Sequence, residues 1–131
     1  MRNLPAGPLV AVEDVRTDVG TLADIADGVG LNGLWLDNCF TDVVSDNGKV
    51  SAHVVGLDGR RTQVWAGEWC RWLQVFTAGA GRAEPYPGYG RAVAIEPMSC
   101  PPNAFRTGID CEYLGGGETR EYQFGCKILA N

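Results

Sequence analysis

Turn signals at short intervals between residues 46 and 78 constrain the fold of this chain more than any other feature. The triplets DNG at 46–48 and DGR at 58–60 contain the residue types that tight turns between antiparallel strands favour. Between and after them lie three segments in which apolar and polar residues alternate: KVSAHVVGL, RTQVWA and WCRWLQVFTA. The first two segments predict a hairpin or meander over residues 46–69, and the third predicts a further strand after it.

A second alternating segment, LNGLWLDNCFTDV at residues 31–43, precedes the meander. Its period of two predicts a strand that places Asp37 on the same face as Trp35. An aspartate before Cys39 is also typical of a turn in which the carboxylate bonds its own backbone. The preceding Leu-Trp-Leu favours the strand.

Glu96 ends an apolar run, AVAI, and is followed by Pro97 and by a pair of prolines at 101–102. Proline lacks the amide hydrogen that a ladder needs, so we expect strand pairing to stop at Pro97. The segment therefore predicts a strand that presents a carboxylate next to a loop. A more ordinary role for Glu96 is an ion pair with an arginine such as Arg91.

Strands at this regular spacing predict an all-β sandwich or barrel, folded as a single domain over residues 1–131. Small and acidic residues at 16–30 predict one short helix or helical turn. The loop at 79–90 is rich in Gly, Pro and Tyr, which is typical of loops that line ligand sites. Further short strands are expected at 9–12, 110–114 and 119–129.

Charge and composition exclude several classes of partner and cofactor. A net charge of −5 with dispersed basic residues argues against nucleic acid and favours a neutral polar ligand. No signal peptide or membrane-spanning segment is recognisable, so we expect a cytoplasmic protein without a membrane partner. Five cysteines without a CxxC pair, and the single histidine His53, indicate reduced thiols, no metal site and no cofactor. His53 is expected at a surface position of a strand.

Four segments, LWLDNCF, WLQVFTA, AVAIEPMSCPPNAF and GGGET, together resemble the aldose 1-epimerase family, the galactose mutarotases. They occur in that family's order and near its spacing. The resemblance covers nearly the whole chain, but members of the family are more than twice as long. It therefore implies the carboxy-terminal portion of a galactose mutarotase-like β-sandwich.

The resemblance also implies roles for two residues. Glu96 matches the family's general base, and Asp37 matches the aspartate that binds sugar hydroxyls. Asn38 stands where galactose mutarotases more often have histidine, so the preferred sugar stays open. The family's general-acid histidine belongs to an amino-terminal part that this chain lacks.

The implied activity is the interconversion of the α and β anomers of a free aldohexose. A base removes the proton of the C1 hydroxyl while an acid protonates the ring oxygen, and each group contributes on the order of 10²–10⁴-fold. Two alternatives stay open: a non-catalytic carbohydrate-binding β-module, and a hexose-6-phosphate 1-epimerase. The latter needs clustered arginines, which the sequence does not group convincingly.

Half of a sandwich has unpaired strand edges and an uncovered apolar face. We therefore expect the isolated chain either to associate with itself or to require a complementary amino-terminal polypeptide.

Overall fold

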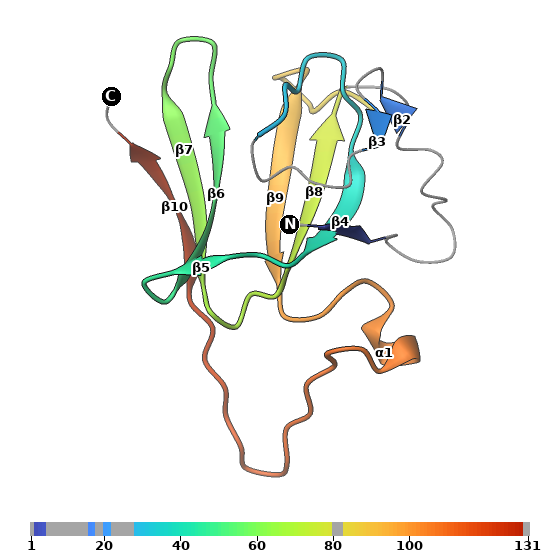
Figure 1. Cartoon of the computed structure of the whole chain (residues 1–131), viewed down its shortest axis with the longest axis vertical. Coiled ribbons are helices and arrows are strands. Elements are labelled where there is room, and N and C mark those ends of the chain that lie inside the picture. Colours follow the sequence, from blue (N-terminus) through green and yellow to red (C-terminus); the bar gives the residue numbers. More distant parts are fainter. Residues whose placement is uncertain (1, 5–15, 18–19, 22–27, 80–82, 130–131) are drawn as a thin grey trace.

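The computed structural model describes residues 2–4, 16–17, 20–21, 28–79 and 83–129 of the chain. These residues form two four-stranded sheets and one two-stranded sheet, all antiparallel (Figure 1). The first sheet has the strand order β1-β4-β8-β9, and the second sheet has the order β10-β7-β6-β5. The two-stranded sheet consists of β2 and β3. The expected all-β class is therefore confirmed.

The elements have the following bounds: β1 Arg2–Leu4, β2 Arg16–Thr17, β3 Gly20–Thr21, β4 Asp37–Thr41, β5 Ser45–Asp46, β6 Lys49–Val55, β7 Arg61–Gly67, β8 Trp72–Ala78, β9 Ala92–Met98, α1 Ala104–Thr107 and β10 Phe124–Leu129.

The hairpin or meander expected at 46–69 is present as β5, β6 and β7, which are neighbours in one sheet. The further strand expected after it is β8, which belongs to the other large sheet. Asn47 and Gly48 both have positive φ, 50° and 77°, as a two-residue turn between β5 and β6 requires. In the next turn the Gly56 amide donates to the Arg60 carbonyl at 2.9 Å, and Gly59 also has a positive φ. Both turn signals therefore mark true hairpin connections.

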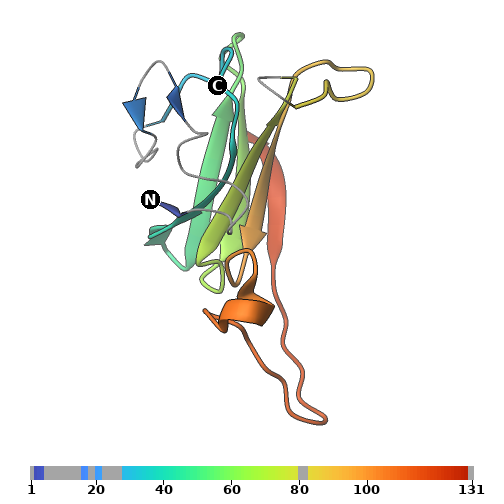
Figure 2. The ribbon, with the colours of Figure 1, turned by 90° about the vertical axis from the view of Figure 1, so that its right-hand side faces the viewer.

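The two large sheets pack against each other over part of their area (Figure 2). One core cluster joins Val50 and Ala66 of the second sheet to Leu73 of the first, with Ile95 packed against it. A further cluster lies on the first sheet and contains Phe40, which is fully buried. Other members of this second cluster are Leu34, Leu36 and Val75. The inner face of the first sheet is thus mainly apolar, with Asn38 and Thr77 as buried polar residues on it.

The row on the inner side of β10 is exposed. Phe124 and Ile128 pair with Ala66 and Thr62, on the core-facing side of β7, yet they are 66% and 73% exposed. The other large sheet ends at β9, which contacts β7. This uncovered row agrees with the expectation that the isolated chain has an open apolar face.

Strand β9 continues through Pro97 to Met98, so the prediction that pairing stops at Pro97 is wrong. The Thr77 amide donates to the Leu36 carbonyl, which lies on the β4 side of β8. Every second residue of a strand directs its backbone N–H and C=O to the same side, so Leu73 also directs these groups toward β4. Its partner Pro97 then turns its nitrogen away from β8, toward the open edge of the sheet. An edge position of this kind accommodates proline without losing a ladder bond.

Three other expectations need correction. Part of the helix expected at 16–30 is instead the ladder between β2 and β3. Residues 18–19 and 22–27 of that segment lie outside the described residues, and so does the strand expected at 9–12. Residues 110–114 form no strand, and the last strand is shorter than 119–129, because it begins at Phe124. The helix α1 was not expected.

Residues 108–123 form a long excursion beyond the ends of the sheets (Figures 1 and 2). Its return is held against the body by Trp69, whose ring centroid lies 4.8 Å from that of Tyr122 and whose Nε1 donates to the Gln123 carbonyl. Its outgoing part is held by Asp110, which accepts hydrogen bonds from Trp72 Nε1 and from Arg71, both at 2.9 Å. Polar contacts to side chains therefore replace the ladder that was expected there.

Candidate functional site

Asp37 and Glu96 lie on the same face of one sheet, on strands that flank β8. Asp37 is the first residue of β4 and pairs with Phe76, whereas Glu96 on β9 pairs with Gln74. Because Gln74 and Phe76 are two residues apart on β8, all of these side chains project from the same face. It is the face opposite the apolar core. On it Cys39 and Trp72 are buried, whereas Glu96 is exposed.

The spacing of the two carboxylates follows from the register. Two strand separations and one step of two residues place the Cα atoms of Asp37 and Glu96 about 12 Å apart. Gln74 lies between them. A ligand that contacts both carboxylates must therefore also pass over Gln74.

Gln74 is the residue that the sequence analysis did not assign to the site. Its Nε2 donates to Asp37 Oδ1 at 2.7 Å, which fixes the orientation of both side chains. Its Oε1 is buried and has no hydrogen-bond partner. A buried acceptor without a partner is uncommon and costs free energy unless a ligand or water satisfies it. The available signal was a polar residue between Trp72 and Phe76 in an otherwise apolar alternation.

Glu96 is exposed, and no hydrogen bond or ion pair joins it to another described residue. The ion pair considered with Arg91 is absent, since Arg91 Nη2 instead donates to the Leu31 carbonyl at 2.5 Å. Asp37 is half-buried and belongs to a strand, as its sequence context predicted. The two predicted site residues thus differ in solvation, with Asp37 anchored and Glu96 in contact with solvent.

Cys39 lies in the same cross-strand row as Gln74 and Glu96 and is fully buried. Burial raises the pKa of its thiol to about 12, with a smaller contribution from Cys100. At neutral pH this thiol is protonated and unreactive. Cys39 therefore forms part of the floor of the site and is not a nucleophile.

The single histidine is not near the site. His53 is exposed on β6, in the other large sheet, as the sequence predicted. Tyr86 and Tyr89 of the predicted glycine-rich loop are exposed, with ring centroids 6.1 Å apart. That loop follows the end of β8 at Ala78, whereas Gln74 lies four residues earlier in the strand.

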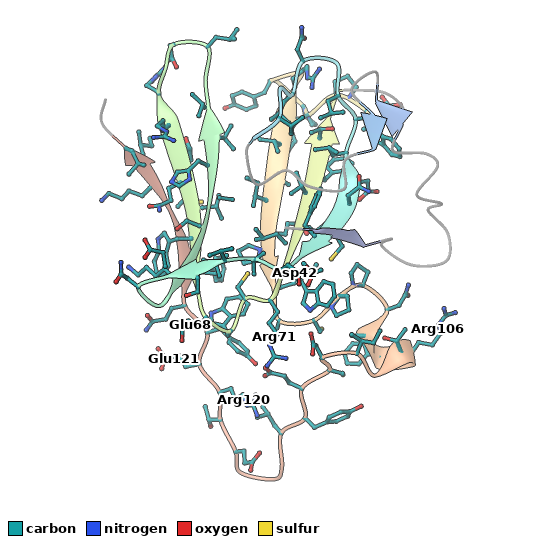
Figure 3. The ribbon with its side chains drawn as sticks, viewed as in Figure 1. Asp42, Glu68, Arg71, Arg106, Arg120 and Glu121 are labelled. Carbon is teal, nitrogen blue, oxygen red and sulfur yellow. The ribbon has the colours of Figure 1, made fainter. Side chains whose placement is uncertain are left out.

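Arginines do not gather around Glu96 in the described part of the chain. Arg71 pairs with Asp110 at 2.9 Å and Arg60 pairs with Asp58 at 2.5 Å. Figure 3 shows Arg71, Arg106 and Arg120 below the sheets, around α1 and the excursion. Among the side chains that the structure describes, no group of guanidinium groups near Glu96 resembles a phosphate site.

Over the described ranges there is no cluster of three or more His, Cys, Asp or Glu side chains suited to a metal ion. The same residues contain no helix with the length and hydrophobicity needed to cross a membrane.

Comparison of the chain with protein-family models, with curated proteins and with solved structures finds no match in any of the three. The resemblance to aldose 1-epimerases therefore stays a hypothesis that rests on the sequence motifs.

Proposed function

We propose that this chain is an aldose 1-epimerase-like polypeptide that takes free aldohexoses on the outer face of the first sheet. Glu96 is the base for the C1 hydroxyl, and Asp37 anchors sugar hydroxyls. The observation that carries the proposal is the buried Gln74 Oε1, which has no partner and lies between the two carboxylates. A sugar hydroxyl placed there would supply the missing donor.

Each of these three residues has a distinct task. Asp37 Oδ1 already accepts from Gln74, so its second oxygen is left to accept from a sugar hydroxyl. Gln74 Oε1 accepts from a neighbouring hydroxyl, which limits rotation of the pyranose. Glu96 removes the proton of the C1 hydroxyl, the ring opens to the aldehyde, and the carbonyl rotates before the ring closes.

On this face we assign no described residue as the general acid, so the proton for the ring oxygen has to come from a group elsewhere. His53, the only imidazole of the chain, lies in the other sheet. A complementary amino-terminal polypeptide that carries the acid would complete the pair, and without it we expect a low rate.

A non-catalytic carbohydrate-binding module is the second candidate. Glu96 is exposed and has no polar partner among the described residues, whereas Asp37 and Gln74 are oriented by their mutual hydrogen bond. An oriented acceptor pair beside an unconstrained carboxylate is sufficient for binding alone. The hexose-6-phosphate alternative lacks comparable support, because Arg71 and Arg60 are each engaged by an aspartate.

Polarimetry of freshly dissolved α-D-glucose and α-D-galactose tests the proposal. Mutarotation with the wild-type protein should be faster than the spontaneous reaction, and with Glu96→Gln it should proceed only at the spontaneous rate. Asp37→Asn should raise the sugar concentration at which the rate is half-maximal. Glu84→Gln, a change of the same type on an exposed loop residue, serves as the control.

Calorimetry with the same sugars separates the two candidates. Binding that Gln74→Leu abolishes, without catalysis by wild type, would establish the module. Full activity of Glu96→Gln would disprove the assignment of the base.

A further inference from the structure

The outer face of the second large sheet carries a concentration of basic residues that the linear sequence does not reveal. The alternating register places four exposed basic side chains, Lys49, His53, Arg61 and Lys127, on the side of β6, β7 and β10 that faces away from the core. We call these four residues the basic face. They include both lysines and the only histidine of a chain whose net charge is −5.

No acidic residue occurs in β6, β7 or β10. Carboxylates lie at both ends of the basic face. At one end Asp58 pairs with Arg60 in the turn between β6 and β7. At the other end Asp46 on β5 is the cross-strand partner of Lys49, and Glu68 follows the last residue of β7. Lys49, Arg61 and Lys127 form no ion pair with any described residue. Their charges are thus available to an external anion.

Uncharged groups suited to a sugar lie between the cations. Trp65 is half-buried, and its indole packs over Gly125, where an added Cβ would lie 3.0 Å from Nε1. Lys49 Nζ lies 4.7 Å from the centroid of the Trp65 ring. On the same face the Gln63 amide donates to the Ser51 hydroxyl at 2.9 Å. The face therefore combines cations, an aromatic ring and neutral hydrogen-bonding groups.

The positions of the cations match an extended ligand. Arg61 and Lys49 lie three ladder rows apart, because Arg61 pairs with Val55 and Lys49 pairs with Gly67. Each row advances two residues along a strand, so the face extends over about 20 Å. Lys127 lies one row from Arg61, on the neighbouring strand. A linear polymer with repeated negative charges would contact all three.

We propose that the basic face binds an acidic polysaccharide, a polymer of sugars that carry carboxylates. The guanidinium of Arg61 and the two ammonium groups match carboxylates, while Trp65, Gln63 and Ser51 match the hydroxyls and ring faces of the sugar units. A nucleic acid and a polymer of uronic acids can each carry one negative charge per unit, so the net charge of −5 opposes both. The sugar polymer presents several hydroxyls per unit to Gln63 and Ser51, whereas a nucleic-acid backbone presents few. The interspersed neutral groups therefore favour the polysaccharide.

The proposal is independent of the anomer chemistry. The basic face and the site of Asp37, Gln74 and Glu96 belong to different sheets, and each faces away from the core that lies between the sheets. Loss of activity at Glu96 leaves the basic face intact, and loss of polymer binding leaves the site on the first sheet intact.

Isothermal calorimetry of the full chain with a short oligogalacturonate, over a series of NaCl concentrations, tests the proposal. Wild type should bind, and its affinity should fall as the salt concentration rises. Lys127→Gln should lose about tenfold in affinity, the scale of one charge-assisted contact, and Lys127→Arg should retain binding. Replacement of Lys49, Arg61 and Lys127 together by Gln should abolish binding.

Arg106→Gln is the matched control, because it removes one positive charge from exposed α1, away from the second sheet (Figure 3). An equal loss in Arg106→Gln would overturn the proposal, since the effect would then be one of net charge. It would also be overturned by absence of binding, by tighter binding of oligothymidylate than of oligogalacturonate, or by equal binding of a neutral malto-oligosaccharide.

Discussion

The hydroxyl of Thr77 holds the segment that leads into β4, and its removal should destabilise the fold measurably. Thr77 Oγ1 accepts from the Leu36 amide at 2.8 Å and donates to the Leu34 carbonyl at 3.0 Å. Thr77 is 1% exposed, so water does not compete for these groups. Because Asp37 follows Leu36 directly, the same bonds position the site.

Thr77→Val keeps the shape of the side chain and removes both bonds. The Leu36 N–H and the Leu34 C=O are then buried without this partner, and each loss destabilises the fold by about 1–3 kcal/mol. The added methyl group stabilises the fold by about 1 kcal/mol. We expect the free energy of unfolding to fall by about 3 kcal/mol, read from the midpoint of urea denaturation at an unchanged slope.

Thr77→Ser is the matched control, because it keeps the hydroxyl and loses one methyl, at a cost of about 1 kcal/mol. The valine variant should therefore unfold at a lower urea concentration than the serine variant. If Thr77→Val proves as stable as Thr77→Ser, the two hydrogen bonds do not stabilise the segment as argued.

Three further perturbations test other parts of the fold by the same denaturation assay. Gly79→Ala should destabilise the fold more than Gly88→Ala. Both glycines have a positive φ, which costs about 1 kcal/mol for alanine, but of the two only the Cβ added at Gly79 would meet a backbone oxygen, that of Gly90 at 2.6 Å. Asp110→Ala should cost about 2 kcal/mol, because it leaves the indole N–H of the buried Trp72 without its acceptor. The raised pKa of Cys39 contributes stability that is present below the ordinary value of 9.0 and is lost as pH rises toward 12, so Cys39→Ala should flatten the decline of stability over that range.

Each of these expectations has an opposite outcome. Equal losses for the two glycine variants would exclude the backbone clash. An Asp110→Ala protein with wild-type stability and unchanged tryptophan fluorescence would mean that the excursion is held by other contacts. A pH profile that Cys39→Ala leaves unaltered would show that other groups cause the alkaline decline.

Local signals predicted the meander because its turns depend on the residues within them. Asn47 and Gly48 tolerate positive φ, and the alternation in β6 and β7 determines which side chains face the core. The excursion failed as a prediction for the same reason, since its conformation depends on distant partners such as Trp69 and Trp72. Short apolar runs there resemble strands but have no neighbour to pair with.

By itself the sequence determined that the chain is rich in β-strands, that Asp37 belongs to a strand, and that Glu96 closes an apolar run. Periodicity carries such information because it acts over a few residues. Only the tertiary structure decided that Pro97 stays within β9, that Gln74 lies between the two carboxylates, and that three dispersed cations share one face. Each of these depends on which strands are neighbours, and pairing between distant segments is set by the packing of the whole chain.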